Sequence, residues 1–192
     1  MIATTNRAKS FLLFAVSVFT LLVITTATVA QSKRTIDIQI PQNVPLKVKL
    51  KKAKEEEYQD LNNERWLRSV ELEVTNTGDR NIYVLSLVWT LPEVKMPDGN
   101  PFGSTFLYGR HEFITVPGTR PTPEDAPLEP GETHVFKMRD NIAGGWEYHA
   151  KENDLHPKSV LVFFNFLGFG DGTGQQSLNG QFFNIEKRTP DK

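Results

Sequence analysis

The sequence predicts an all-β protein, an antiparallel sandwich of about seven to nine strands with long loops. Two observations support this fold class. Apolar and polar residues alternate with a period of two through several short segments, which is typical of strands with one buried and one solvated face. Turn-forming residues separate these segments at short intervals, as expected for neighbouring antiparallel strands.

The strands can be placed in chain order. The expected segments are 36–40, 46–50, 70–74, 82–91, 133–138, 160–167 and 181–186. The first three alternate strictly, so each should bury one face. The fourth and sixth are apolar on both faces, which indicates central strands that are covered on both sides.

Three turn signals separate these strands. Asn76-Thr77-Gly78-Asp79 joins two strands, and its glycine is expected at positive φ. Pro130-Gly131 is the pair that a type II turn favours at its two central positions. Asp171-Gly172 is another strong turn signal.

Three other segments do not follow the strand pattern. The charged segment 51–65 is either a solvated loop or a short helix that carries Tyr58, Leu61 and Trp66 on one side. The proline-rich segment 116–130 predicts a stiff, extended surface loop. The segment 141–158 is expected to contain one or two helical turns. With no repeat and no linker in sight, residues 31–192 should form a single domain.

The first thirty residues have the layout of a secretory signal peptide. Arg7 and Lys9 give a basic start, an apolar run covers 11–24, and small residues precede Gln31. The alternative is an uncleaved anchor, because residues 11–30 could just span a bilayer core of ~30 Å. We therefore expect a secreted or periplasmic protein that could contact the membrane only through an uncleaved leader.

Composition narrows the classes of partner and chemistry. The chain has 22 Lys and Arg against 23 Asp and Glu, and two of the basic residues fall in the predicted leader. A nearly balanced, slightly acidic domain is unlike nucleic-acid-binding proteins, which need a basic stripe. There is no cysteine, which excludes disulfides, thiolate catalysis and cysteine–zinc sites.

Two turn motifs bear a family resemblance. The segment Val70-Glu-Leu-Glu-Val-Thr-Asn-Thr-Gly-Asp79 and the segment Leu128-Glu-Pro-Gly-Glu132 each precede a strand. Both resemble the turns of CARDB-type immunoglobulin-like domains of bacterial exported proteins, over roughly residues 69–139. The resemblance implies an immunoglobulin-like sandwich and says little about function. The whole chain is also similar to short exported proteins of uncharacterised function.

No segment matches a catalytic or metal-binding motif. His111-Glu112 lacks the second histidine of a zinc-protease motif, since position 115 is threonine, so we expect a polar loop that leads into a strand at 113–116. Asp171 lies among glycines, but calcium would need more carboxylates nearby. We therefore expect no catalytic residues, no metal and no cofactor.

Loop aromatics are the best candidates for a binding surface. Aromatic residues on loops give large contact areas at low entropic cost in protein- and sugar-binding modules. Trp146 and Tyr148 lie in the irregular segment 141–158, and Tyr108 lies beside Arg110 and His111. With Asp171, whose turn could shape a binding surface, the candidate ligand-binding residues are Tyr108, Arg110, His111, Trp146, Tyr148 and Asp171.

Three functions remain open from the sequence. The first is an exported, non-enzymatic module that binds a protein or a glycan through its loops. The second is an envelope hydrolase that uses a pair of carboxylates, whose spacing a sequence does not reveal. The third is a structural envelope component that associates through an edge strand.

Overall fold

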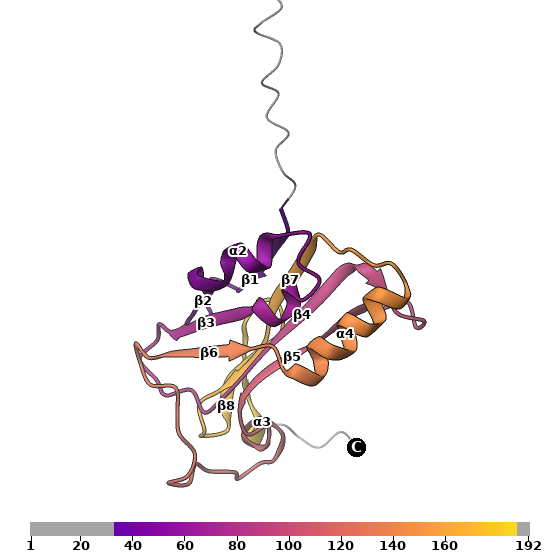
Figure 1. The fold of residues 1–192 in the computed structure, drawn as a ribbon. Coiled ribbons are helices and arrows are strands. Elements are labelled where there is room, and N and C mark those ends of the chain that lie inside the picture. The colour runs from indigo at the N-terminus through magenta and orange to yellow at the C-terminus, as the bar shows by residue number, and fades with distance from the viewer. Residues whose placement is uncertain (1–32, 188–192) are drawn as a thin grey trace, which may run out of the picture. The chain divides into compact units, whose positions relative to one another are not determined.

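The computed structural model describes residues 33–187, and the predicted signal peptide (residues 1–30) lies outside them. The described residues form two β-sheets that pack face to face, which confirms the predicted all-β sandwich. The larger sheet, sheet A, has six strands, and the smaller sheet, sheet B, has three. Figure 1 shows β3 and β6 of sheet B crossing in front of β4 and β7 of sheet A.

Sheet A has the order β5-β4-β7-β8-β9, and β1 pairs with the first half of β7. Its strands are β1 (Thr35–Gln39), β4 (Val84–Lys95), β5 (Pro101–Gly109), β7 (Ser159–Gly168), β8 (Thr173–Gln176) and β9 (Gln181–Asn184). The pairing of β1 with β7 is parallel, whereas the other pairs of named strands in the described region are antiparallel. The two strands that are apolar on both faces, β4 and β7, lie in the middle of the sheet, as expected.

Sheet B has the order β2-β3-β6 and covers one face of sheet A. Its strands are β2 (Leu46–Leu50), β3 (Glu71–Asn76) and β6 (Thr133–Lys137). Leu72 and Val74 of β3 share one buried cluster with Leu87 and Trp89 of β4 and with Phe164 of β7. Burial of these side chains between the sheets supplies the main driving force for the fold.

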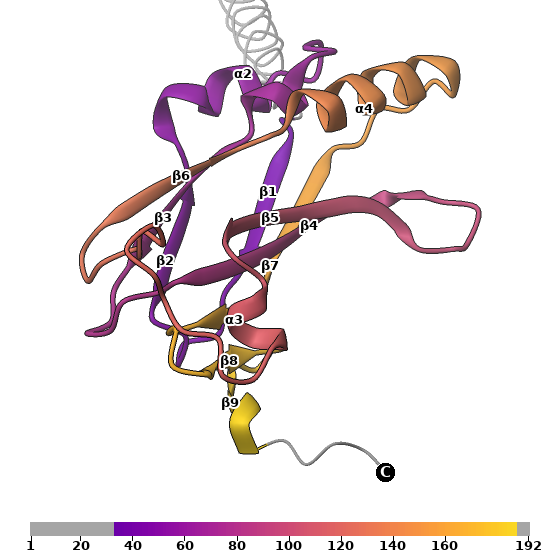
Figure 2. The same ribbon diagram turned by 90° about the horizontal axis from the view of Figure 1, so that it is seen from below.

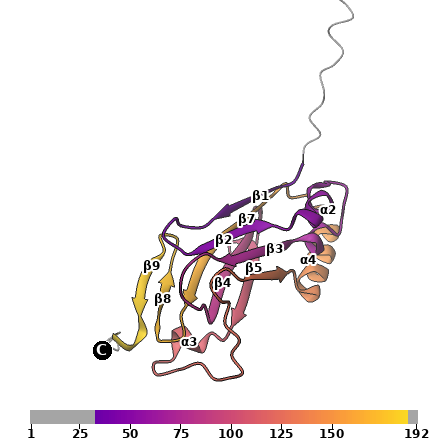
Figure 3. The ribbon, with the colours of Figure 1, turned by 90° about the vertical axis from the view of Figure 1, so that its left-hand side faces the viewer.

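Short helical segments lie at both ends of the sandwich. One end has the 3₁₀ helices η1 (Lys52–Lys54) and η2 (Trp66–Ser69) and the α-helices α2 (Glu55–Gln59) and α4 (Asp140–Glu152). The opposite end has α3 (Glu112–Thr115), the β8–β9 hairpin and the 3₁₀ helix η3 (Ile185–Lys187). Figures 2 and 3 show this separation of the two ends. Among the described residues, no helix is long and apolar enough to cross a membrane.

The end with α2 and α4 is closed by aromatic rings. Tyr58 of α2, from the segment left open between loop and helix, packs edge-on against Trp66 with 5.9 Å between ring centroids. Trp66 in turn packs against Trp146 of α4 at 6.1 Å. The helical option for this charged segment is confirmed only in part. The single turn of α2 buries Tyr58, but α2 ends at Gln59, so Leu61 lies outside it and Trp66 belongs to η2.

Two local predictions are wrong. The expected strand at 113–116 is the short helix α3, in which the amide of Val116 donates to the carbonyl of Glu112. Phe113 is buried there against Tyr83, with 5.7 Å between ring centroids. The turn after β3 also does not place Gly78 at positive φ. Instead, the side-chain oxygen of Asn76 accepts the Gly78 amide at 3.0 Å, so the asparagine shapes the turn.

Candidate functional site at the loop end

A cleft of about 320 Å³ lies at the end of the sandwich that carries the β8–β9 hairpin. We call it the loop-end cleft. Its walls come from the β1–β2, β3–β4 and β7–β8 connections together with β8 and β9. The lining includes Asn43, Asp79, Arg80, Phe169, Gln175 and Phe182. Segments that are far apart in the sequence therefore build one site.

The cleft is open because the inner face of sheet A is buried as far as β8 but not at β9. The strand register pairs Leu167 with Gln175 and Gln175 with Phe182, so these three side chains lie on the same face of the sheet. Leu167 lies in the core between the sheets, and Gln175 is 0% exposed. Phe182 is 67% exposed, so its ring remains open to a ligand.

The floor of the cleft is held by hydrogen bonds of Gln175. Its Nε2 donates to the carbonyl oxygens of Asn43 at 3.0 Å and of Gly180 at 3.2 Å. Nδ2 of Asn43 also donates to the Gly180 carbonyl at 3.0 Å. These contacts join the β1–β2 and β8–β9 turns. Oε1 of Gln175 is buried and has no hydrogen-bond partner among the described residues.

Arg80 forms one wall of the cleft and is held in place from two sides. Its guanidinium carbon lies 3.8 Å from the ring centroid of Phe169. Its Nη2 contacts Oδ2 of Asp171 at 2.7 Å and Oγ1 of Thr173 at 3.2 Å. Burial acts to raise the pKa of Asp171, but the hydrogen bonds from Thr173 and the charge of Arg80 outweigh it and lower this pKa.

Several polar groups of the cleft have no protein partner. Within the described residues, Nε and Nη1 of Arg80 make no hydrogen bond, so this side of the guanidinium fork is free. The carboxylate of Asp79, which is exposed, likewise makes no ion pair or hydrogen bond with the part of the chain that the structure describes. The cleft therefore presents unused donors and acceptors side by side.

Tyr108 and Arg110, two of the predicted binding residues, instead hold the proline-rich loop. The hydroxyl of Tyr108 donates to the carbonyl of Ala126 at 2.8 Å. Arg110 binds both carboxylate oxygens of Asp125, at 2.6 and 2.8 Å. His111 lies beside Phe166, with 5.3 Å between ring centroids. The contacts of Tyr108 and Arg110 fasten the loop to the sandwich.

Trp146 and Tyr148 lie on opposite sides of α4, and the expectation that Trp146 is an exposed contact residue is wrong. Trp146 is 1% exposed and packs against Phe102 with 5.2 Å between ring centroids. Tyr148 is 70% exposed. The reason is helical geometry, since two residues advance about 200° around an α-helix and point to opposite faces. The segment 141–158 was expected to contain only one or two helical turns, but α4 is a helix of 13 residues.

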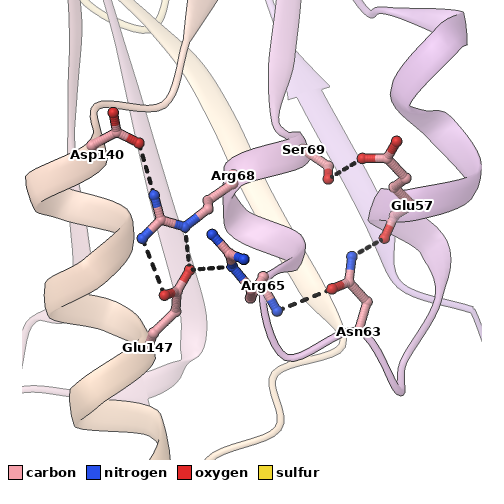
Figure 4. Close-up of polar contacts among 7 residues, drawn as sticks. All are labelled: Glu57, Asn63, Arg65, Arg68, Ser69, Asp140 and Glu147. Carbon is pink, nitrogen blue, oxygen red and sulfur yellow. Dashed lines mark hydrogen bonds and ion pairs between the residues drawn. The ribbon is translucent and has the colours of Figure 1, made fainter.

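Figure 4 shows the polar contacts that hold α4 against η2. Nε of Arg68 donates to Glu147 at 2.6 Å, and Nη1 of Arg68 donates to Asp140 at 2.7 Å. Arg65 lies 3.9 Å from the same glutamate. On the other side of η2, Ser69 donates to Glu57 at 2.8 Å. Arg68 thus pairs with two of the three acidic residues of α4, and the cluster has a clear structural role.

Six of the described carboxyl groups have a pKa that their surroundings lower. The pKa of Asp125 is lowered to about 2. The groups are Glu57, Glu71, Glu93, Asp98, Asp125 and Asp171.

The structure brings together few of the residues predicted for the site. Of these, only Asp171 lies beside the loop-end cleft, through its ion pair with Arg80. The unpaired cleft residues Asp79 and Phe182 were not predicted. Their signals in the sequence are weak: a charged residue in a turn, and one aromatic among several. The described residues contain no group of three or more histidines and acids placed to hold a metal ion.

Comparison with known proteins finds no relative that would indicate a role for the cleft. No family model matches the chain, and no curated protein or solved structure matches it.

Proposed function

We propose that this protein is an exported, non-enzymatic binding module that takes its ligand in the loop-end cleft. One observation carries the proposal: the exposed ring of Phe182 lies in the same cleft as the unpartnered donors of Arg80 and the unpartnered carboxylate of Asp79. Binding sites commonly combine apolar surface with a few convergent polar groups. Export rests on the signal-peptide layout of residues 1–30, and the immunoglobulin-like resemblance agrees with an accessory domain of this kind.

The rigidity of the cleft supports a binding role. Gln175 fastens two turns to each other, and Arg80 is held by Phe169, Asp171 and Thr173. A ligand that enters such a preformed site orders few protein side chains, so less of the contact energy is lost to entropy.

The test is an NMR titration of residues 31–192, which contain the described unit of 33–187. Pools of soluble oligosaccharides and pools of short synthetic peptides serve as probes. We expect at least one pool to shift amide signals of the cleft, and expect Phe182→Ala to weaken this binding markedly. Leu178→Ala is the matched control, because Leu178 is also 67% exposed, follows β8 and does not line the cleft.

The result that would overturn the proposal is equally specific. If no pool shifts the cleft amides, or if Leu178→Ala weakens binding as much as Phe182→Ala, the cleft is not the binding site. Both side chains are largely exposed, so neither substitution should impair folding. The amide spectra of the free variants verify this directly.

A further inference from the structure

We infer that the ligand of the loop-end cleft is an uncharged carbohydrate that places one or two sugar rings in the cleft. This inference rests on the proposed function and adds the chemical class of the ligand. The cleft volume of about 320 Å³ is near the lower end of the ~300–1,000 Å³ that small-molecule sites occupy. A short stretch of an oligosaccharide fits that size.

The first argument is the open aromatic ring. Phe182 projects from β9 on the inner face of sheet A and is largely exposed. A sugar ring has a face made of C–H groups, and that face can pack flat on an aromatic ring and bury apolar area on both partners. Phenylalanine has no polar tip, so this contact would use the ring face alone.

The second argument is the mixture of donors and acceptors beside that ring. Each sugar hydroxyl both donates and accepts hydrogen bonds. Arg80 offers donors at Nε and Nη1, and its neighbour Asp79 offers carboxylate oxygens, all without partners among the described residues. Two adjacent hydroxyls of one sugar can therefore be bound by two consecutive residues of the β3–β4 turn.

The third argument is a buried acceptor at the floor. Gln175 lines the cleft and is 0% exposed, and its Oε1 has no donor within the described region. Buried polar atoms in folded proteins are nearly always hydrogen-bonded. Both protons of Nε2 are directed to backbone carbonyls, so the amide cannot be turned over without losing those bonds. Because Oε1 is fully buried, a ligand hydroxyl can donate to it only after a small movement of the cleft floor.

The fourth argument is charge, which decides against acidic sugars. The positive charge of Arg80 is already balanced by Asp171 at 2.7 Å. Asp79 adds a further negative charge to the lining. A carboxylated, sulfated or phosphorylated sugar would meet like charges here, and juxtaposed like charges suppress binding.

A peptide fits the cleft less well. The residues that anchor protein partners usually fill enclosed apolar pockets from which water is fully excluded. In the loop-end cleft, the apolar ring of Phe182 is itself exposed, and the floor is polar around Gln175. An uncharged sugar matches both features, since it has an apolar face and many hydroxyls.

The experiment begins with a glycan array that carries neutral, amino and acidic oligosaccharides, probed with residues 31–192. The strongest neutral binder is then titrated by NMR against matched variants. We expect Phe182→Ala to raise Kd by about tenfold or more, a loss of about 1.4 kcal/mol. Phe182→Tyr, which retains the ring, should remain near wild type, and Leu178→Ala should bind as wild type. Asp79→Ala should weaken binding without changing the amide spectrum of the free protein outside the turn.

Every other outcome overturns either the carbohydrate inference alone or both proposals. If only peptides shift the cleft amides, the carbohydrate inference is overturned and the binding module stands. If acidic sugars bind and their neutral counterparts do not, the inference is again overturned. If a neutral sugar binds but Phe182→Ala leaves its Kd unchanged, the site lies elsewhere and both proposals fail. If no probe shifts the cleft amides, both fail as well.

Discussion

The guanidinium of Arg80 lies over the ring of Phe169, with 3.8 Å between its central carbon and the ring centroid. Arg80 follows β3 of sheet B, and Phe169 follows β7 of sheet A. One stacked pair therefore links the β3–β4 connection to the β7–β8 connection beside the cleft. The same arginine is paired with Asp171, so its position is set before any ligand arrives.

The stacked pair predicts a measurable loss of stability. Arg80→Ala should lower the free energy of unfolding by about 1 kcal/mol, because it removes both a cation–π contact and a partly exposed ion pair. Arg120→Ala is the control, since Arg120 pairs with Glu186 and has no aromatic ring beneath it among the described contacts. Urea denaturation measures both. An equal loss in the two variants would show that the ring of Phe169 contributes nothing.

The two aromatic residues of α4 should respond in opposite ways to truncation. Trp146→Ala should destabilise the protein by about 3–5 kcal/mol, because the indole is buried between Trp66 and Phe102. Tyr148→Ala should change stability by no more than about 0.5 kcal/mol, since that ring is in solvent. Chemical denaturation of both variants checks the orientation of the helix. A small effect at Trp146 would contradict the packing described here.

Two glycines in left-handed conformations should differ in how they tolerate alanine. At Gly180, with φ of +63°, a Cβ atom would lie 2.7 Å from both Asn43 and Val44. At Gly131, with φ of +82°, as its type II turn requires, nothing lies within 4 Å of that position. Gly131→Ala should therefore cost only backbone strain, about 1 kcal/mol. Gly180→Ala should cost about 2 kcal/mol or more and should disturb the cleft floor.

Thermal unfolding and amide spectra of the two alanine variants test this difference. The Gly180 variant should shift the signals of the β1–β2 turn, whereas the Gly131 variant should leave them in place. Equal melting temperatures would argue against close contact between the β8–β9 turn and Asn43.

The proline-rich loop should loosen in acid. Hydrogen bonds from Arg110 and from Thr122 lower the pKa of Asp125 to about 2, compared with 3.8 in the unfolded chain. A lowered folded-state pKa means that the stabilising contribution is complete above about pH 4 and is lost as the pH falls towards 2. Amide signals of residues 119–127 should therefore broaden or shift in this range. Asp125→Asn should show loosened contacts already at neutral pH and should lack the acid transition.

The sequence predicts an element correctly where neighbouring residues determine it, and fails where contacts with distant residues do. The alternation of Val70, Leu72 and Val74 is a local pattern, and it correctly predicts a half-buried strand. The short apolar run of Phe113 and Ile114 is compatible with either a strand or a helix. Contacts with the distant Tyr83 and Phe166 favour the helix, so local pattern alone was insufficient.

The candidate site was mostly missed because it is assembled over long distances. Asn43, Arg80 and Gln175 meet only after two sheets have packed, and no spacing in the sequence marks them as neighbours. Trp146 could have been placed correctly. Ala143 and Trp146, three residues apart, are the buried pair of α4, which is the spacing of one helical face.

The pairing of β1 with β7 joins the first described strand to a strand near the end of the domain. Thr35 contacts Lys158, which lies 123 positions further along the chain. Synthesis runs from the N-terminus, so β1 is made early and stays unpaired until nearly the whole domain exists. Contacts of such long range slow folding, because a large loop must close first. The strand β1 therefore finds its partner only after β7 has been made. A C-terminal truncation before β7 should leave β1 without a partner strand.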